Sequence, residues 1–441
     1  MKYEEYKNSG IEWIGDVPSH WEVMKTSLAF HHIGSGTTPS TSKREYYDDE
    51  GAYWLQTGDL TDGLIIDTSK KVSKIAVREC NLKFYPKNSV VIAMYGATIG
   101  KMGLLQIQCA TNQACCVLPY NKHFDARYTF YFFLSAKSDL LISAIGGGQP
   151  NISQDVIKKT KITFPPLIEQ QAIAAYLDKK CGEINRAIDI QKKKIDLLNE
   201  LKQTIITDAV TKGLNPNAPM KDSGVEWIGE VPKHWEVMKL NFACKKITDF
   251  VASGSFADLR NNVTYLDEPD YAMLVRTADL SGKDKAIAKV YVSKHSYKFL
   301  SNSNLFGGEV ILPNIGASIG DVYIVPEHIY EKATLGPNSI MLISKTDNNF
   351  LYYLFRSKRW REALIILGQA AAQSKFNKTE VRGLKVIIPP ITEQQTIVAH
   401  IEKKVSKMDL QISKANRRIE LLEELKQSII TEAVTGKIKV C

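Results

Sequence analysis

Two stretches of the chain carry the same long pattern of apolar residues. Each follows a proline pair, Pro165–Pro166 or Pro389–Pro390, and opens with Glu-Gln-Gln, at residues 169–171 or 393–395. Apolar residues then recur at steps of three and four, which marks one face of a helix. Their mean step of about 3.5 favours a coiled-coil seam over an ordinary surface helix. We therefore predict long helices over residues 167–214 and 391–441.

The apolar positions of the second stretch are those of the first shifted by 224. A helix of about 45 residues would be about 65 Å long, too long to bury such a stripe on itself. Because the chain carries one other helix of the same length and phase, we predict that the two helices pair with each other. The alternative is that each helix packs on its own globular domain. The predicted seam consists of Ile184, Ile188, Ile195, Leu198 and Ile205 in the first helix and Met408, Ile412, Ile419, Leu422 and Ile429 in the second.

Two further repeats indicate that the whole chain is a duplication. ELKQTIITDAVT at 200–211 returns as ELKQSIITEAVT at 424–435, and SGIEWIGDVPSHWEVMK at 9–25 returns as SGVEWIGEVPKHWEVMK at 223–239. The offset grows from 214 to 224, so the second globular region is ten residues longer than the first. Each half therefore reads as a Trp-rich lead, a globular region and a long helix.

The globular regions share a weaker pattern. The apolar runs Val90–Met94 and Val310–Leu312 predict buried strands, and a Gly-Ala-x-Ile-Gly turn follows each run. An aromatic-rich helix is predicted at Tyr128–Ile145 and again at Phe350–Leu367, each followed by a loop of small residues, at 146–153 and 370–377.

These patterns predict an α+β fold. Mixed α/β domains at 1–166 and 215–390 would be separated by a pair of long helices, which a pseudo-two-fold axis between the two halves would make antiparallel. The framework is shared and the loops differ, so one scaffold would present two different recognition surfaces.

Length, composition and charge limit the number of domains, the cellular location and the kinds of ligand to expect. The chain has 441 residues, more than a single core usually holds. No apolar run approaches a membrane span of about 20 residues, and the start MKYEEYKNSG has no apolar signal core. Seven cysteines without a CxxC pair suggest a reducing, cytoplasmic location and no zinc site. A net charge of +9 permits nucleic-acid binding but does not establish it.

Catalytic motifs are missing. The sequence has no GxxxxGK[ST] phosphate loop, and Gly34–Gly36 lacks the third glycine of a dinucleotide site. An amino-methyltransferase would need an Asn/Asp-Pro-Pro-aromatic motif, of which only the proline pairs are present, and these read better as helix starts. His20 and His234 stand beside tryptophans and are expected to be packed rather than basic catalysts. We predict no catalytic or metal-binding residues.

Polar side chains that could read base edges gather in the predicted loops. Arg and Lys suit guanine, and Asn and Gln suit adenine, through paired hydrogen bonds in the major groove. A solvated surface role is the alternative for each of them. The run Arg356, Lys358, Arg359 and Arg361 would suit phosphates or form a plain solvated helix face. The candidates are Thr37, Thr38, Ser40, Lys43, Arg44, Gln56, Thr57, Lys101, Gln149 and Asn151 in the first region and Ser255, Arg260, Asn261, Asn262, Arg276, Thr277, Asn314, Lys375 and Asn377 in the second.

Taken together, the motifs resemble the specificity (S) subunit of type I restriction–modification systems. The likeness covers essentially residues 1–441 and rests on the SGxEWIGxVPxHWEV lead, on Gly96–Gly100 followed by Ala110–Gln113, on the Pro-Pro to Glu-Gln-Gln helix start and on the ELKQxIIT(D/E)AVT helix end. The resemblance implies that each globular region is a target recognition domain for one half of a bipartite, asymmetric double-stranded DNA site.

The resemblance also implies partners and cofactors. The helices would dock two modification (M) subunits, which bind S-adenosylmethionine and methylate adenine at N6. Two restriction (R) subunits would use ATP and Mg to translocate and cleave DNA, and this chain would bind no cofactor itself. The second small-residue loop lacks the triple glycine and proline of the first, which puts in doubt a transfer of roles from Gln149 and Asn151 to Gln373 and Lys375.

Two other classes stay open on the sequence. One is a self-contained DNA methyltransferase or nuclease, against which the missing motifs weigh. The other is a scaffold that does not bind DNA.

Overall fold

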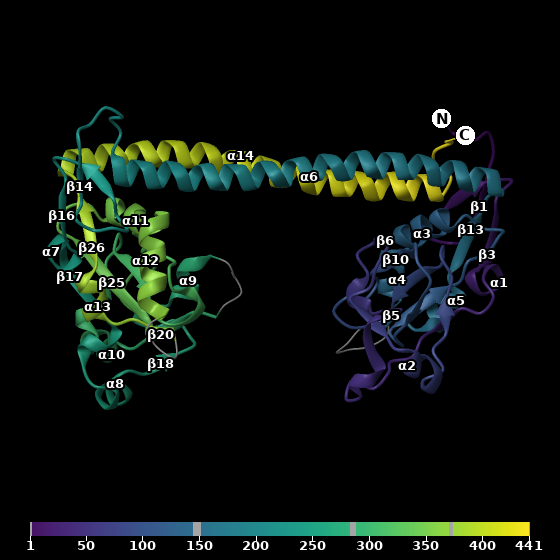
Figure 1. Cartoon of the computed structure of the whole chain (residues 1–441), viewed down its shortest axis with the longest axis horizontal. Helices are drawn as coiled ribbons and strands as arrows, with labels where there is room; N and C mark the ends of the chain where they lie inside the picture. Colours follow the sequence, from purple (N-terminus) through teal and green to yellow (C-terminus); the bar gives the residue numbers. More distant parts are fainter. Residues whose placement is uncertain (1, 144–150, 283–287, 370–373, 441) are drawn as a thin grey trace. The chain divides into compact units, whose positions relative to one another are not determined.

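The computed structural model describes residues 2–143, 151–282, 288–369 and 374–440. The chain forms two compact units. The first unit consists of residues 1–192 and 416–441, and the second of residues 193–415. Each unit therefore combines one globular domain with part of both long helices (Figure 1).

The long helices are α6 (Leu167–Lys212) and α14 (Ile391–Val434). Both start where a proline pair ends, and the carbonyls of Pro166 and Pro390 accept the first helical N–H groups. Past their C-terminal ends stand Gly213 and Gly436, with φ of 74° and 71°. This left-handed conformation costs glycine little and is a common helix stop.

The two helices run antiparallel in each unit (Figure 1). In the first unit Lys426 Nζ donates to Asn185 Oδ1 at 2.9 Å, and in the second Lys202 Nζ donates to Asp409 Oδ1 at 2.5 Å. The two residue numbers of each pair add to 611, so both units have the same helix register. The duplication relates the two bonds as well, because both partners are shifted by 224.

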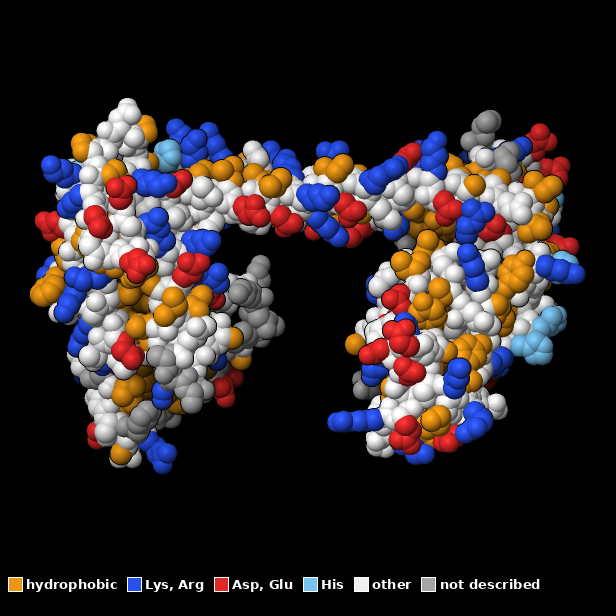
Figure 2. Space-filling model, in the orientation of Figure 1, with side chains coloured by type: hydrophobic (Ala, Val, Ile, Leu, Met, Phe, Trp, Pro, Cys, Tyr) orange, Lys and Arg blue, Asp and Glu red, His pale blue; other side chains and the backbone are white. Residues whose placement is uncertain are grey.

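Burial separates two faces on these helices. Of the ten predicted seam residues, Ile184 and Ile188 are buried and the other eight are half-buried. Other aliphatic residues lie in solvent, so hydrophobic side chains interrupt the charged surface of the helices (Figure 2). Away from the first turns of the helices, these exposed residues are Ile190, Leu197, Leu201, Leu410, Leu421 and Leu425.

The first domain holds two main sheets. One has the strand order β4-β12-β9-β10-β6 and the other β7-β5-β11-β8, while the pairs β1-β2 and β13-β3 belong to the lead and its contact with the strand before α6. The strands are β1 Tyr6–Asn8, β2 Asp16–Pro18, β3 Glu22–Lys25, β4 Gly34–Ser35, β5 Tyr47–Leu55, β6 Gly63–Ile65, β7 Lys70–Val72, β8 Phe84–Tyr85, β9 Val90–Ala93, β10 Met102–Leu105, β11 Cys109–Thr111, β12 Cys115–Leu118 and β13 Lys161–Phe164.

The second domain repeats this plan with a different division of strands. Its sheets have the orders β17-β25-β22-β23 and β18-β20-β19-β24-β21, with the pairs β14-β15 and β16-β26. The strands are β14 Met220–Asp222, β15 Glu230–Pro232, β16 Glu236–Lys239, β17 Cys244–Asp249, β18 Tyr265–Leu266, β19 Ala272–Val275, β20 Val290–Val292, β21 Asn304–Leu305, β22 Val310–Pro313, β23 Tyr323–Ile324, β24 Ala333–Leu335, β25 Ser339–Ser344 and β26 Lys385–Ile388.

Shorter helices cover these sheets. In the first domain they are α1 Thr26–Ala29, η1 Arg44–Tyr46, η2 Thr57–Asp59, α2 Lys74–Glu79, α3 Ala126–Ser135, α4 Lys137–Ile142 and α5 Gln154–Lys159. In the second they are α7 Leu240–Ala243, η3 Phe250–Ser253, α8 Phe256–Asn262, α9 Thr277–Ser281, α10 Lys294–Phe299, η4 Ser301–Ser303, η5 Gly316–Ser318, α11 Asn348–Arg356, α12 Lys358–Gln369 and α13 Lys378–Gly383.

The predicted strands at 90–94 and 310–312 are confirmed as β9 and β22, both fully buried. The Gly-Ala-x-Ile-Gly turns are confirmed too, because all four glycines have φ between 74° and 93°. The prediction of one continuous aromatic helix in each domain is wrong. The second copy breaks at Ser357, which adopts an extended conformation and donates its hydroxyl to the Leu354 carbonyl at 2.6 Å. The first copy breaks at Ala136, between α3 and α4.

Each Trp-rich lead packs on the start of a long helix. In the first unit the Glu169 carboxylate accepts hydrogen bonds from the Tyr3 hydroxyl (2.6 Å) and Trp21 Nε1 (3.0 Å), and His20 Nε2 lies 3.0 Å from it. In the second unit His234 Nε2 lies 2.7 Å from Glu393. Both histidines thus contact the first glutamate of a long helix, although their side chains are 47% and 50% exposed rather than packed.

The residue after that glutamate ties the helix to the globular domain. Gln170 is buried, donates to the Pro165 carbonyl (2.9 Å) and accepts from Asp125 N–H (2.9 Å). Gln394 does the same with the Pro389 carbonyl (2.7 Å) and the Thr346 hydroxyl (2.9 Å). The first two residues of the Glu-Gln-Gln triplet therefore each have a specific partner where the start of the long helix meets the lead and the globular domain. We call this contact region the joint.

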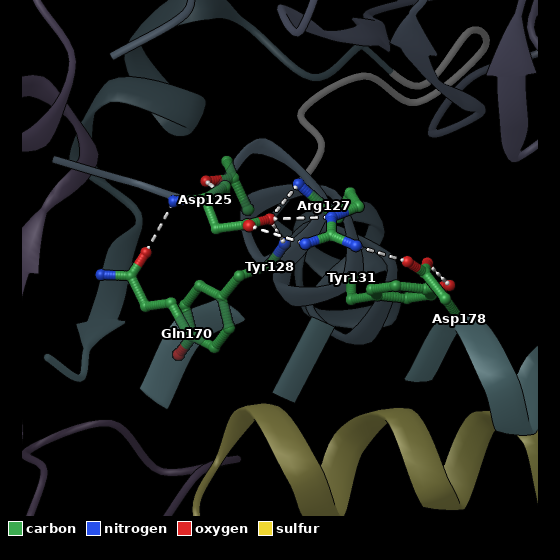
Figure 3. Close-up of polar contacts among 7 residues, drawn as sticks. Asp125, Arg127, Tyr128, Tyr131, Gln170 and Asp178 are labelled. Atoms are coloured by element: carbon green, nitrogen blue, oxygen red, sulfur yellow. Dashed lines mark hydrogen bonds and ion pairs between the residues drawn. The ribbon is translucent and has the colours of Figure 1, made fainter. Parts of the chain in front are cut away.

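In the first unit a charged network extends this joint (Figure 3). Arg127 links Asp125 at the start of α3 to Asp178 on α6, with distances of 3.0 and 2.9 Å. Tyr131 donates its hydroxyl to the same Asp178 at 2.9 Å. Burial, together with Asp178, raises the pKa of Tyr131, so this phenol stays a hydrogen-bond donor at neutral pH.

The repeated end of each long helix holds the domain in the same unit. Gln427 and Gln203 donate to the carbonyls of Leu134 (3.4 Å) and Arg356 (2.8 Å), both near the break of an aromatic helix pair. Thr431 accepts from the Ser135 hydroxyl at 3.0 Å, and Thr207 accepts from Lys358 N–H at 3.3 Å. Each domain is therefore seated on the start of one long helix and the end of the other.

The hydrophobic cores join the same parts. One core combines Trp21 of the lead with Phe132 of α3, Ile173 of α6 and Val434 of α14. The other combines Trp235 with Phe355, Ile397 and Val210 in the equivalent arrangement. In the described ranges no helix is both long and apolar enough to cross a bilayer.

A matched pair of isoleucines tests the buried face of the helices. Ile188 is 6% exposed and Ile190, two positions along α6, is 62% exposed. Ile188→Ala should lower the free energy of unfolding by about 2–4 kcal/mol, because it leaves a cavity. Ile190→Ala should change it by less than about 0.5 kcal/mol. Urea denaturation of both variants measures this, and equal losses would contradict the assignment of Ile188 to the seam.

The two lead joints give a second matched pair. Glu169→Ala removes the acceptor of the buried Trp21 N–H and of Tyr3, and we expect a loss of about 2–3 kcal/mol in unfolding free energy. Glu393→Ala removes the contact with His234 from a side chain that is 29% exposed, and should cost about 1 kcal/mol or less. Thermal unfolding compares them, and a larger loss for Glu393→Ala would show that the first joint is not the stronger one.

Candidate nucleic-acid interface

The loop after strand β4 carries five of the predicted base-reading residues. Two hydrogen bonds hold its backbone in place. Trp54 Nε1 donates to the Thr37 carbonyl (3.1 Å), and the Tyr47 hydroxyl donates to the Pro39 carbonyl (2.9 Å). The side chains of Thr37, Thr38 and Ser40 lie in solvent. The Ser40 hydroxyl lies 2.8 Å from the Ser42 hydroxyl. A loop with a fixed backbone and exposed polar side chains is suited to presenting hydrogen-bonding groups to a ligand.

The two cations at the end of this loop differ. Lys43 Nζ donates to the Tyr46 hydroxyl at 2.9 Å and lies 3.8 Å from the Glu79 carboxylate. Arg44 begins the short helix η1 and is exposed. Arg44 is therefore the more available of the two for an external anion or base edge.

Three further candidates of the first domain are partly committed to the fold. Gln56 and Thr57 are half-buried at the start of η2, where Asp59 accepts the Gln56 N–H at 2.8 Å. Lys101 donates to Asp62 at 2.9 Å, and Lys137 donates to the same oxygen at 2.9 Å. Burial acts to raise the pKa of Asp62, but the bonds from Lys137 and Lys101 outweigh it and hold the pKa below its usual value. Asp62 thus stays ionised and holds Lys101 in place.

The predicted candidate Gln149 lies outside the described residues, as does Gln373. Asn151 is described and exposed, just before α5.

In the second domain the candidates on α8 share one short helix. Ser255 is its N-cap, and its hydroxyl accepts from Asp258 N–H at 3.2 Å. Arg260 and Asn261 are exposed. Asn262 donates to the Asp258 carbonyl and lies 3.2 Å from His295 Nε2. Among the candidates on this helix, Arg260 and Asn261 are therefore the ones without a side-chain hydrogen bond to another described residue.

Most of the remaining candidates of this domain are held by other protein groups, and one is exposed. Arg276 donates to the Asp279 carboxylate (both bonds 3.0 Å) and to the Ala288 carbonyl (2.7 Å), and Thr277 follows it half-buried at the start of α9. Asn314 donates to the Phe376 carbonyl at 2.9 Å. Asn377 is the N-cap of α13, whereas Lys375 is exposed. Contact of these residues with DNA stays a prediction.

The basic run at 356–361 is mostly held by protein groups. Arg356 donates to the Tyr352 hydroxyl (2.7 Å), Arg359 to the Ile228 carbonyl, and Arg361 lies 3.8 Å from Asp321. The run therefore mainly fixes α12 against the lead and the turn before β23.

Sequence reasoning missed the residues of the joints. Gln170, Gln203 and Thr207 have specific polar partners, and their recurrence in the second half at 394, 427 and 431 was the available signal. Within the described ranges no cluster of three or more His, Cys, Asp or Glu side chains could hold a metal ion.

Comparison with known proteins shows which family this chain is similar to. Residues 18–200 and 232–423 match the family model of the type I restriction modification DNA specificity domain. The type I restriction enzyme MjaVIII specificity subunit of Methanocaldococcus jannaschii is 26% identical over 96% of this chain and 94% of its own length. The EcoKI specificity subunit of Escherichia coli is 21% identical over 96% of this chain and 90% of its length.

Solved structures show the same fold. A chain from work on complex assembly and conformational transition of the type I R-M system superimposes with a TM-score of 0.68 at 15% identity, over 96% of this chain and 99% of that one. The HsdS subunit from Thermoanaerobacter tengcongensis gives a TM-score of 0.50 at 17% identity, over 99% and 100%. The predicted α+β duplication with a pair of long antiparallel helices is thus confirmed.

The two matched regions fall one in each half of the duplication and together cover most of the sequence. The chain therefore belongs to the family of type I restriction–modification DNA specificity subunits, and it is the recognition member of such an enzyme rather than the catalytic one.

Proposed function

We propose that this chain reads a bipartite, asymmetric site on double-stranded DNA, with one globular domain on each half of the site. The observation that carries this proposal is the duplication itself: one framework is present twice and presents different polar side chains. The first domain offers an anchored Thr- and Ser-rich loop with Arg44, and the second offers Arg260 and Asn261 on a helix. Unlike side chains at the readers would select unlike bases.

In this proposal the antiparallel helices set the gap between the two half-sites. Helix α6 has 46 residues and α14 has 44. At 1.5 Å per residue each is about 65–70 Å long, which is about two turns of DNA. Pairing in one register would keep the gap constant, because neither helix can slide without breaking the Lys202 and Lys426 bonds and the buried seam.

The exposed aliphatic residues of the helices support docking of two like partners. Leu421 and Leu425 in the first unit correspond to Leu197 and Leu201 in the second by the shift of 224. All four are 48–65% exposed. Exposed apolar groups at equivalent positions suit a partner that binds twice. We assign these positions to two M subunits.

If M subunits dock here, the remaining subunits and cofactors of the complex follow from the family resemblance. The M subunits would bind S-adenosylmethionine and methylate adenine at N6, and two R subunits would add ATP- and Mg-dependent translocation and cleavage. This chain would hold none of these cofactors. The complex would act in the cytoplasm, where the six described cysteines would stay unpaired thiols, as they are in the structure.

The decisive experiment maps methylated motifs by long-read sequencing in cells that carry this chain with its M subunits. We expect a single two-part motif with a fixed gap. Methyl transfer by the purified chain alone, or a motif with one part only, would refute the proposal.

Arg44→Ala tests the division of labour between the domains. Because Arg44 lies exposed in the first domain, its loss should relax or weaken recognition in one half of the motif by about 1–3 kcal/mol, or about 5- to 150-fold, and leave the other half unchanged. Methylation of a library with randomised half-sites measures both halves at once. Lys375→Ala is the matched variant in the second domain, and changes in the same half-site for both variants would contradict the division.

Pairs of leucines test the docking of M subunits. Leu421→Asp with Leu425→Asp should abolish one docking position, so that the complex contains one M subunit instead of two. Leu197→Asp with Leu201→Asp should do the same at the other position. Native mass spectrometry counts the subunits. Ile366→Asp, on the 69% exposed Ile366 of α12, is the control. Two M subunits on both double variants would exclude this surface.

A further inference from the structure

A short helix follows each Trp-rich lead and carries a large apolar side chain that lies in solvent. Leu28 in α1 is 68% exposed, and Phe242 in α7 is 61% exposed. The two residues are equivalent, because the shift of 214 that relates the leads also relates them. A single exposed apolar residue needs no explanation, but the same exposure at both copies of one position calls for one.

Two lysines stand at directly opposite positions of neighbouring strands beside each of these helices. Lys25 pairs with Lys161 between β3 and β13, and Lys239 pairs with Lys385 between β16 and β26. Like charges at such positions destabilise an antiparallel pair. None of the four lysines forms an ion pair with a residue that the structure describes, and Lys161 Nζ donates to the Gly10 carbonyl at 3.2 Å. The fold alone therefore gives no reason for a lysine pair at this place in both halves.

In the first domain the lysine pair and the apolar side chain share one surface. Lys25 is the residue just before α1, and Leu28 follows it by three positions, which places both on one side of the helical turn. The N–H and hydroxyl of Thr26 both donate to the Thr160 carbonyl, at 2.8 and 2.7 Å. These bonds hold the start of α1 against the residue just before Lys161.

The second domain repeats this arrangement. Lys239 stands just before α7, and Phe242 follows it by three positions. The Leu240 N–H donates to the Leu384 carbonyl at 2.8 Å, which holds the start of α7 against the residue just before Lys385.

A further cation comes from the helix that packs on each of these turns. Helix α5 contacts α1, and α13 contacts α7 (Figure 1). Lys158 and Arg382 lie in the last turns of α5 and α13 and are equivalent by the shift of 224, whereas Asp155 and Glu380 lie in the first turns. We call this surface the basic flank. It consists of Lys25, Leu28, Lys158 and Lys161 in the first domain and of Lys239, Phe242, Arg382 and Lys385 in the second.

In the first domain the basic flank and the candidate reading loop lie at opposite ends of strand β12. Before this strand, the Asn112 carbonyl accepts from the Gly36 N–H of the reading loop at 3.3 Å. After the strand, the Asn121 side chain donates to the Ala29 carbonyl at the end of α1.

The second domain separates the two surfaces in the same way, along strand β25. Before this strand, the Asn338 carbonyl accepts from the N–H of the candidate Asn314 at 3.2 Å. After it, the Lys345 N–H donates to the Ala243 carbonyl at the end of α7, at 2.9 Å. DNA bound to the candidate reading residues would therefore lie at the other end of each sheet from the basic flank.

The chemistry of the basic flank fits an acidic protein surface. Cations without ion-pair partners favour an anionic partner. An exposed leucine or phenylalanine contributes to binding by entering an apolar pocket, which a phosphate backbone does not offer. Equivalent flanks in the two domains suit a partner that binds twice.

We propose that the basic flank of each domain docks a protein subunit present in two copies, through an acidic surface with an apolar pocket for Leu28 or Phe242. The inference rests on the proposed function for its partners, because the M and R subunits are the two-copy members of that complex. DNA outside the reading loops is the other polyanion that could cover the flank, and the experiment separates the two.

The test assembles the complex from this chain and purified M and R subunits and counts the subunits by native mass spectrometry. Leu28→Glu should weaken the binding of one copy of one subunit type by about tenfold or more, and Phe242→Glu should do the same for its second copy. The double variant should lose both copies. Leu64→Glu and Phe306→Glu are matched controls, because these side chains are 60% and 79% exposed in the same domains outside the basic flank. Both controls should leave all counts unchanged.

Lys25→Ala and Lys239→Ala separate docking from damage to the fold. Each removes one member of a like-charge pair, so the melting temperature should rise or stay unchanged while the same subunit as in the glutamate variants binds more weakly. A lower melting temperature together with the loss of a subunit would show that these lysines only support the fold, and would overturn the inference.

The remaining outcomes are distinct. Loss of either M or R subunits from the flank variants supports the inference and identifies the partner. Full counts in the double variant overturn it, and weaker DNA binding in gel shifts at a stated salt concentration, with full counts, would assign the flank to DNA instead. A wild-type complex that assembles but gives no two-part methylation motif overturns the proposed function alone.

Discussion

The burial of two matched apolar stripes against each other is the constraint on which the rest of this molecule depends. Neither long helix can hide its stripe alone, and in each unit the antiparallel partner covers it in the register fixed by Lys426 and Lys202. This pairing places the start of one helix beside the end of the other. We call the place where these two helix ends meet the seat of the globular domain. The seat exists only because the two ends meet, and the lead, the Glu-Gln-Gln triplet and the ELKQ segment all make contacts there.

The duplication explains why some sequence identities are strict and others are not. Several residues that recur in both halves have a specific partner at the seat, such as Gln203 and Gln427. The candidate DNA-contacting residues differ between the halves and lie mainly on loops and on α8. Positions at the seat must match a fixed acceptor, whereas the exposed loop positions have no such constraint from the fold.

Much of the fold could be predicted from sequence. The long helices, the buried strands β9 and β22 and the glycine turns follow from periodicity and from left-handed backbone positions, which are local signals. The break in the aromatic helix of the second domain could not be predicted, because it depends on a single extended residue, Ser357, whose hydroxyl satisfies the helix end. The candidate site was harder still. Lys101, Arg276 and Asn377 were predicted to contact DNA because of their residue type. In the fold, each has a hydrogen-bond partner or caps a helix, which the sequence does not show.

The seat has one property that bears on how such proteins change. Gln427 and Gln203 bind main-chain carbonyls of the globular domains, Leu134 and Arg356, rather than their side chains. A carbonyl is present whatever residue stands there, so these two hydrogen bonds depend on the backbone path of a domain and not on its side chains. A foreign domain with the same helix break could be spliced in without remaking the frame, and a new DNA preference would then arise in a single recombination event rather than by gradual substitution.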